Sequence, residues 1–156
     1  FSRYASGQDR LLVLIDYTKP STEKRFYILD LLQKKLLLST YVAHGRGSGD
    51  NYAVAFSNRP GSYQSSLGFF RTGDTYMGKN GYSLFLDGLE KGINDKARER
   101  AIVVHGANYA DPAVLKGQQR LGRSLGCPAL PPDISKQVID TIKGGVLLYI
   151  YGLNKA

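Results

Sequence analysis

The hydrophobic pattern of the first third of the chain is typical of β-strands. Apolar runs at residues 11–17, 25–31 and 36–43 are rich in leucine, β-branched and aromatic residues, and each has the length of a strand. The polar residues 33–35 between the second and third runs predict a hairpin bend. A helix over residues 29–38 is the alternative, because four leucines there could share one face. We prefer the hairpin, since strand-forming residues flank the bend on both sides.

The rest of the chain continues with short strands separated by glycines and loops. Further strands are expected at residues 68–72, 82–86, 102–105 and 146–151. The stretch from residue 44 to residue 66 has no hydrophobic period. A loop of that length usually carries function or is disordered, so we treat it as a candidate functional segment.

Helical signals are confined to three short segments. Asn94 is expected to cap a helix that ends near Arg100, with Asp95 in its first turn. Residues 111–117 begin with an Asp-Pro pair and end on a glycine, which favours a helix start and a helix end. The clearest helix is expected over residues 133–142, where isoleucine and valine recur every fourth residue before two glycines.

Together these patterns predict a single domain over residues 1–156. We expect a mainly β fold with a few short helices, folded as a β-sandwich or open barrel and not as a βαβ fold. A chain of this length buries roughly 68–70% of its unfolded surface, which is enough for a core of its own. The sequence leaves the oligomeric state open.

The chain is strongly basic. With 21 Lys and Arg against 13 Asp and Glu, the formal net charge is +8 and the pI is near 9.6. Such a field favours an anionic partner, namely a nucleic acid, an acidic membrane surface or an anionic cell-wall polymer. Because no recognition-helix or RNA-binding aromatic motif is present, we expect no nucleic-acid partner. No signal peptide or membrane span is visible, and the first residue is Phe1, so we interpret the chain as a mature or trimmed fragment.

Candidate chemistry lies between residues 102 and 132. His105 ends a β-branched run, which favours a ring that projects from a strand terminus. A lone cysteine is most often a small buried apolar residue. Cys127, however, lies between Gly126 and Pro128 in a polar loop, which is typical of a tight turn. A thiol on such a turn and a strand-end histidine are the components of a cysteine nucleophile and its general base.

The order and context of these residues resemble a known active-site signature. His105 and its following glycine, a spacer that ends at Arg123, and then Ser-x-Gly-Cys at residues 124–127 resemble the L,D-transpeptidase catalytic domain of bacterial peptidoglycan synthesis. Two positions differ from the family pattern. Leu125 replaces a histidine, and Pro128 stands where the pattern leads into a polar or basic residue, so the chain resembles a divergent Ser-x-Gly-Cys-Pro branch.

The resemblance implies a cysteine-dependent acyl transfer. The thiolate of Cys127 would attack the carbonyl of the third, L-centred residue of a peptidoglycan stem peptide and expel the terminal D-alanine. The acyl group would pass to an amine in L,D-transpeptidation, or to water in an L,D-carboxypeptidase. No metal or organic cofactor is required. An enzyme of this kind would be exported and would act in the periplasm or cell wall.

The resemblance also implies roles for the neighbours of the thiol. His105 would be the base, held by the carbonyl of Gly106. The backbone N–H groups of Gly126 and Cys127 would form an oxyanion hole. Ser124 would orient the turn.

Four further residues are expected to bind substrate. Arg123 is expected to hold a substrate carboxylate by a bidentate fork. His44 ends the third expected strand and would compensate for the missing histidine at Leu125. Asn108 and Tyr109 are expected to line the cleft because they follow His105 closely.

Two other classes of protein remain as alternatives. A papain-like protease is disfavoured, because its cysteine precedes its histidine in the sequence. A non-catalytic basic module that binds cell wall would explain the charge, and its cysteine would react slowly with thiol reagents.

Overall fold

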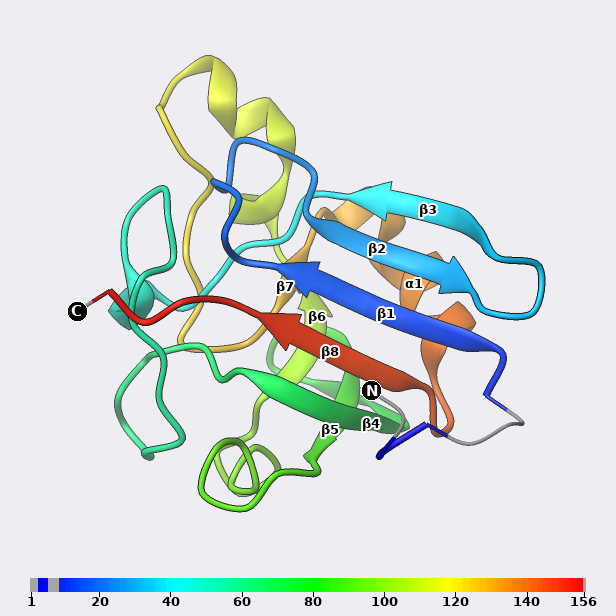
Figure 1. Cartoon of the computed structure of the whole chain (residues 1–156). Coiled ribbons are helices and arrows are strands. Elements are labelled where there is room, and N and C mark those ends of the chain that lie inside the picture. Colours follow the sequence, from blue (N-terminus) through cyan, green and yellow to red (C-terminus); the bar gives the residue numbers. More distant parts are fainter. Residues whose placement is uncertain (1–2, 6–8, 156) are drawn as a thin grey trace.

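The protein is organised around one curled sheet (Figure 1). The computed structural model describes residues 3–5 and 9–155, and within them eight strands run in the order β3-β2-β1-β8-β4-β5-β6-β7. The strands are β1 (Leu11–Asp16), β2 (Phe26–Asp30), β3 (Lys35–Thr40), β4 (Gly68–Gly78), β5 (Gly81–Gly88), β6 (Val103–Gly106), β7 (Ala129–Leu130) and β8 (Leu147–Tyr151). The helix α1 (Pro132–Ile142) and the 3₁₀ turns η1 (Arg46–Ser48), η2 (Asn108–Ala110) and η3 (Pro112–Lys116) complete the described elements.

The two edges of the sheet meet, so that it forms a nearly closed barrel. Strands β1 and β8 pair in parallel, as do β6 and β7, and the other neighbours are antiparallel. Ala43, three residues after β3, forms an isolated bridge with Ala129 in β7. Its N–H donates to the Ala129 carbonyl at 2.8 Å and its carbonyl accepts from the Ala129 N–H at 3.2 Å. The expected mainly β, open-barrel fold is therefore confirmed.

The inner face of the sheet and one face of α1 form the hydrophobic core. Val13 and Ile15 of β1 are fully buried, and their neighbours on either side, in β2 and β8, are buried as well. Helix α1 lies against the inside of the sheet (Figure 1) and buries Val138, Ile139 and Ile142. The four-residue period expected for residues 133–142 is thus the period of the buried face.

The N-terminal hairpin confirms the preference for strands over a helix at residues 29–38. Strands β2 and β3 pair antiparallel with an irregularity after Ile28, and Lys34 takes a positive φ of 54° in the bend. Strand β4 is longer than expected, because it continues through Gly73 to Gly78 with a change of register between Thr72 and Thr75.

The helix expected at residues 94–100 is wrong, because this stretch is a succession of turns. The Asn94 side chain does not cap a helix. Its amide donates to the carbonyls of Leu67 and Phe69 and accepts from the N–H of Glu90. The side chain therefore ties the turn to the start of β4, and this tertiary contact overrides the local capping preference.

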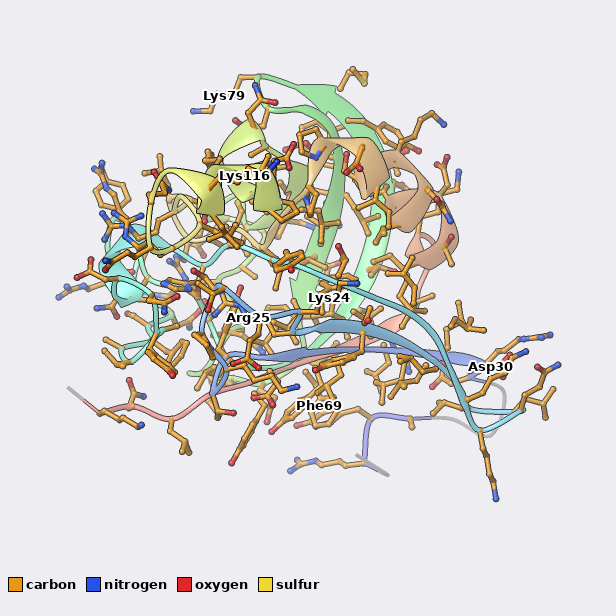
Figure 2. All side chains as sticks on the ribbon, turned by 90° about the horizontal axis from the view of Figure 1, so that it is seen from above. Lys24, Arg25, Asp30, Phe69, Lys79 and Lys116 are labelled. Carbon is orange, nitrogen blue, oxygen red and sulfur yellow. The ribbon has the colours of Figure 1, made fainter. Side chains whose placement is uncertain are left out.

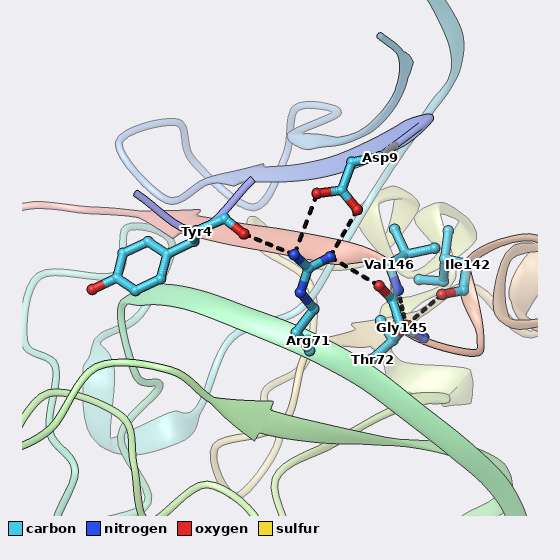
Figure 3. Close-up of polar contacts among 7 residues, drawn as sticks. All are labelled: Tyr4, Asp9, Arg71, Thr72, Ile142, Gly145 and Val146. Atoms are coloured by element: carbon cyan, nitrogen blue, oxygen red, sulfur yellow. Dashed lines mark hydrogen bonds and ion pairs between the residues drawn. The ribbon is translucent and has the colours of Figure 1, made fainter. Parts of the chain in front are cut away.

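A polar network fastens the turn between α1 and β8 to β4 (Figure 3). The guanidinium of Arg71 donates to Asp9, to the carbonyl of Tyr4 and to the carbonyl of Gly145. The buried hydroxyl of Thr72 donates to the Ile142 carbonyl at 2.6 Å. It also accepts from two backbone N–H groups of the turn, at 3.2 and 2.8 Å. The hydroxyl therefore satisfies the Ile142 carbonyl and the Val146 N–H where the helix ends and the strand begins, whereas the Gly145 N–H also donates to the Thr72 carbonyl at 2.8 Å.

Replacement of Thr72 by valine should lower the free energy of unfolding by about 2 kcal/mol, since it leaves buried backbone groups without a partner. Urea denaturation checks this value. Thr72→Ser keeps the hydroxyl and should retain most of the stability. Equal midpoints for the valine and serine variants would contradict the role of the hydroxyl.

Candidate active site

The loop that carries the thiol is clamped by Ser124. The Ser124 hydroxyl donates to the Cys127 carbonyl at 2.6 Å and accepts from the Gly126 N–H at 3.1 Å. Gly126 has a φ of 129°, and a Cβ there would lie 3.0 Å from Ile102 and 3.1 Å from the Gln64 carbonyl. The turn therefore needs glycine both for its backbone angle and for its close packing.

The same contacts correct the expected oxyanion hole. The Gly126 N–H is already bonded to Ser124, so it is not directed at a substrate oxygen. Within the described residues the N–H of Cys127 has no hydrogen-bond partner. Of the two expected donors, only Cys127 is left to stabilise an oxyanion.

The Cys127 thiol lies against the start of β6. Its Sγ accepts from the Val103 N–H at 3.4 Å and donates to the Ala101 carbonyl at 3.4 Å. Burial raises the pKa of this thiol, while the Val103 N–H and the positive charges of Arg100 and Lys79 act in the opposite direction. Burial is the largest of these effects, so the thiol is neutral near pH 7.

His105 is the buried partner in the neighbouring strand. Its side chain is 3% exposed, and Nδ1 lies 3.0 Å from the Gly106 carbonyl. This contact places the ring proton on Nδ1 and leaves Nε2 as an acceptor. Burial lowers the pKa of His105, although the Gly106 carbonyl opposes this effect, and the ring is therefore neutral near pH 7. A neutral imidazole with a free Nε2 is competent as a general base.

Backbone pairing brings the two residues together. His105 pairs with Ala129, and its N–H donates to the Pro128 carbonyl at 3.4 Å, directly after Cys127. Within the described residues the imidazole and the thiol form no hydrogen bond, because the thiol bonds to the backbone of β6 instead. The backbones of His105 and the thiol loop are thus adjacent, but their side chains do not bond to each other.

The expectation that His44 reaches the cleft is wrong. The ring is 1% exposed; Nδ1 accepts from the Arg25 guanidinium at 2.8 Å and Nε2 donates to the Gly49 carbonyl at 3.1 Å. Burial and the charge of Arg25 lower the pKa of His44 to about 4. Both ring nitrogens are used in the interior because the buried Arg25 needs acceptors.

Arg123 is also engaged within the protein. Its Nη1 donates to the Asp50 carboxylate at 3.1 Å and lies 3.4 Å from the carbonyls of Arg46 and Gly49. The carboxylate that it holds in the structure is therefore its own neighbour in the η1 loop. Arg123 was expected to hold a substrate carboxylate by a bidentate fork. In the structure it bonds to Asp50 instead and fastens the η1 loop.

Asn108 and Tyr109 follow the strand that carries His105, and their role in substrate binding stays a prediction. They line an open groove of about 430 Å³ that reaches Gly106, together with Lys79 and Tyr82. Tyr109 packs tightly on Gly122, because a Cβ added to Gly122 would collide with the Cβ of Tyr109. Burial, and secondarily the charge of Cys127, raises the pKa of Tyr109 to about 12.

Sequence reasoning missed two cations, Arg100 and Lys79, whose charges lower the pKa of the thiol. Lys79 lies at the tip of the β4–β5 hairpin (Figure 2). The guanidinium of Arg100 donates to carbonyls and hydroxyls of residues 57–66 and would lie 3.5 Å from a Cβ at Gly126. Neither residue stands in the signature, and only the fold brings them to the thiol.

Comparison with known proteins identifies the family. The profile of the L,D-transpeptidase catalytic domain matches residues 2–151. The chain belongs to this family. As an L,D-transpeptidase catalytic domain it still differs at Leu125, whose side chain is 54% exposed and stands where the family pattern has a histidine. No curated protein sequence matches the chain.

Three solved structures share the fold at low sequence identity. The helical cell shape determining protein Pgp2 from Campylobacter jejuni gives a TM-score of 0.61 at 16% identity, over 95% of this chain and 50% of that chain. An L,D-transpeptidase from Stackebrandtia nassauensis gives a TM-score of 0.55 at 15% identity, over 99% of this chain and 62% of that chain. An L,D-transpeptidase from Mycobacterium smegmatis gives a TM-score of 0.54 at 13% identity, over 92% of this chain and 59% of that chain. This L,D-transpeptidase domain therefore spans about half to three fifths of their length, and the similarity concerns the fold alone.

The described part of this L,D-transpeptidase domain contains neither a cluster of metal ligands nor a helix that could span a membrane. Among residues 3–5 and 9–155, no three His, Cys, Asp or Glu side chains gather as metal ligands. In the same part of the chain, no helix has the length and apolar character needed to cross a membrane.

The buried His44 should make stability depend on acid pH. The unfolded ring binds a proton below about pH 6.5, whereas the folded ring binds one only below about pH 4. The stabilising contribution is therefore full above pH 6.5 and is lost as pH falls to 4, by about 3 kcal/mol. Urea denaturation from pH 7 to pH 4 measures this loss.

His44→Gln is the matched variant, because an amide can accept from Arg25 and donate to Gly49 without titrating. The variant should lose less stability between pH 6.5 and pH 4 than the wild type. Since His105 and the carboxylates titrate in both proteins, the difference isolates His44. Equal pH dependence in the two proteins would refute the buried neutral ring.

The half-buried thiol of Cys127 should react slowly at neutral pH. Because burial raises the pKa of Cys127, its alkylation by iodoacetamide should continue to accelerate at pH values above those at which an ordinary thiol reaches its full rate. Cys127 is the only cysteine, so intact-mass analysis counts its adducts directly. A fast plateau between pH 5 and pH 7 would instead reveal a thiolate paired with imidazolium.

Proposed function

We propose that the protein is a cysteine-dependent acyltransferase that acts on peptidoglycan stem peptides outside the cytoplasm, in the periplasm or cell wall. Cys127 is the nucleophile and His105 is its base. The observation that carries this proposal is the Gly106 carbonyl 3.0 Å from Nδ1 of His105, which leaves Nε2 free beside the turn of the single thiol. Membership of the L,D-transpeptidase family supports the same assignment.

The proposed mechanism starts from a neutral pair. Because desolvation favours the neutral forms of both the half-buried thiol and the buried imidazole near pH 7, Nε2 of His105 takes the thiol proton as Sγ attacks. The thiol first leaves the Ala101 carbonyl, to which it donates at 3.4 Å. The C–S bond forms at the carbonyl of stem residue 3, and the Cys127 N–H stabilises the oxyanion.

The acyl-enzyme forms as the tetrahedral intermediate collapses. The C–N bond to residue 4 breaks, and His105 returns its proton to the leaving amine of D-alanine. An acceptor amine, activated by the same imidazole, then attacks the thioester and regenerates the thiol. Water in place of the amine makes the enzyme an L,D-carboxypeptidase, which is the second candidate.

Slow alkylation of the thiol does not exclude this function. The resting thiol is half-buried and its pKa is raised, so a low reactivity is expected of both an enzyme and a non-catalytic wall-binding module. Turnover is therefore the measurement that separates them.

Incubation with purified tetrapeptide muropeptides should release D-alanine, which mass spectrometry detects together with the product. Cross-linked dimers identify transpeptidation, and tripeptides without dimers identify hydrolysis. Cys127→Ala should abolish release while it retains the wild-type circular dichroism. His105→Gln should lower kcat by about 10²–10⁴-fold, because it removes the base.

Release of D-alanine by folded Cys127→Ala at the wild-type rate would overturn the assignment of the nucleophile. An inactive wild-type protein that still binds the muropeptides would favour the non-catalytic module.

A further inference from the structure

The bend between β2 and β3 exposes three leucines. Leu32 in the bend is 74% exposed, and Leu36 and Leu37 at the start of β3 are 51% and 45% exposed. Single exposed apolar residues are ordinary, but three within residues 32–37 form a contiguous leucine patch. The bend lies at one end of the molecule (Figure 1), next to Asp30 as labelled in Figure 2.

An irregularity in the β2–β3 ladder explains why two neighbouring leucines are both exposed. In a regular strand successive side chains point to opposite faces, so that one of two neighbours is buried. Here Leu29 pairs with Leu36, and Leu37 is left without a partner in the described ladder. A β-bulge of this kind sets two residues of one strand against one residue of the other. The exposed apolar surface is therefore built into the backbone of the bend.

Two free cations accompany the leucine patch. Lys34 and Lys35 lie in the sequence between its first and second leucines, and both are exposed. In the described part of the chain neither lysine forms an ion pair or a side-chain hydrogen bond. Both ammonium groups are therefore available to a negatively charged partner.

The bend has no free carboxylate to balance these charges. From residue 24 to residue 49, Asp30 is the only acidic residue. It is 2% exposed and accepts from the side chain of Arg10 and from the N–H of Gln33. The exposed part of the bend is therefore positive, and it fits a partner that is both anionic and apolar.

We propose that this bend docks on an anionic membrane surface, with the leucine patch among the acyl chains and Lys34 and Lys35 at the lipid headgroups. A segment that lies in the membrane interface gains free energy from buried apolar area and from attraction to anionic lipid. The long stems of the lysines let their ammonium groups stay at the headgroups while the leucines enter the hydrocarbon. The inference does not depend on the proposed function, because none of these residues belongs to the candidate active site.

A second copy of the chain fits the bend less well. Strand β3 is at the edge of the sheet, so its outer side could pair with the same strand of another molecule. In a two-fold dimer, however, each patch meets its own copy, which brings the same lysines together. Like charges that face each other across paired strands are destabilising. An anionic membrane accommodates both the leucines and the lysines, whereas a soluble polyanion accommodates only the lysines.

Docking at the bend leaves the candidate active site free. Strand β3 runs from the bend toward Ala43, which bridges Ala129 beside the thiol loop. The strand has six residues, and at about 3.3 Å per residue the bend lies roughly 15–20 Å from that end of the strand. Substitutions in the bend should therefore leave the active site intact.

Vesicle binding tests the contribution of the leucines. Sedimentation measures binding to vesicles of equimolar phosphatidylglycerol and phosphatidylcholine, and to vesicles of phosphatidylcholine alone. The wild type should bind the anionic vesicles about tenfold more tightly or better. Leu32→Ser should weaken this binding about five- to tenfold, because it removes apolar area without a change of charge. Met77→Ser is the matched control, since Met77 near the end of β4 is 75% exposed, and it should weaken binding by less than about twofold.

The lysines are tested by two double variants of equal net charge. Lys34→Gln/Lys35→Gln should weaken binding to the anionic vesicles about tenfold or more. Lys91→Gln/Lys96→Gln removes the same charge from two exposed lysines in the turns after β5 and should weaken binding by no more than about threefold. An equal loss in the two double variants would overturn the proposal, because binding would then follow the net charge alone.

A fluorescent probe reports insertion directly. In the Cys127→Ala background, an environment-sensitive dye is attached to Leu32→Cys or, as the control, to Met77→Cys. On anionic vesicles the emission should shift to the blue only for the dye in the bend. A dye in the bend whose emission does not shift would show that the leucines stay in water and would overturn the proposal.

Two further results would assign the bend to another partner and so overturn the proposal. Vesicle binding that needs the lysines but is unchanged in Leu32→Ser would indicate a soluble polyanion. Light scattering should give the wild type and Leu36→Ser/Leu37→Ser the same mass. A dimer that only the wild type forms would indicate a second copy of the chain.

Discussion

The bridge between Ala43 and Ala129 is the constraint on which the candidate site depends. Strand β7 has two residues, which is too short to be stable on its own, and it pairs with β6 on one side and with Ala43 on the other. Cys127 lies two residues before Ala129, and His105 pairs with Ala129 directly. The thiol and the imidazole therefore occupy their positions only when both edges of the sheet have met.

A buried cation supports the segment that forms this bridge. Arg25 is fully buried and donates to the Val42 carbonyl, to the Lys19 carbonyl and to His44. No carboxylate accompanies it in these contacts, and burial lowers its pKa to about 10. It remains charged near pH 7, so its neutral acceptors must stay in place to compensate for desolvation. The residues before and after Ala43 are thus held by the same side chain.

The electrostatics of the site follow from burial. Desolvation favours the uncharged forms of both Cys127 and His105, which makes a neutral pair rather than a pre-formed thiolate and imidazolium. The positive charges of Arg100 and Lys79 act against this effect on the thiol and lower its pKa. Other basic residues, such as Arg123 and Lys136, are paired with neighbouring carboxylates.

The sequence by itself determined the strands and the identities of the candidate nucleophile and base. Apolar runs with β-branched residues specify strands through local preference, and glycine before Cys127 indicates the positive φ of its turn, which the structure has at 129°. The tertiary structure decided what those local patterns do not contain. Asn94 bonds to β4 instead of capping a helix, and His44 turns inward to Arg25. Lys79 reaches the groove across a hairpin. The contacts of Asn94 and His44 join residues that are 19 to 27 positions apart in the chain, so only the folded chain brings these groups together.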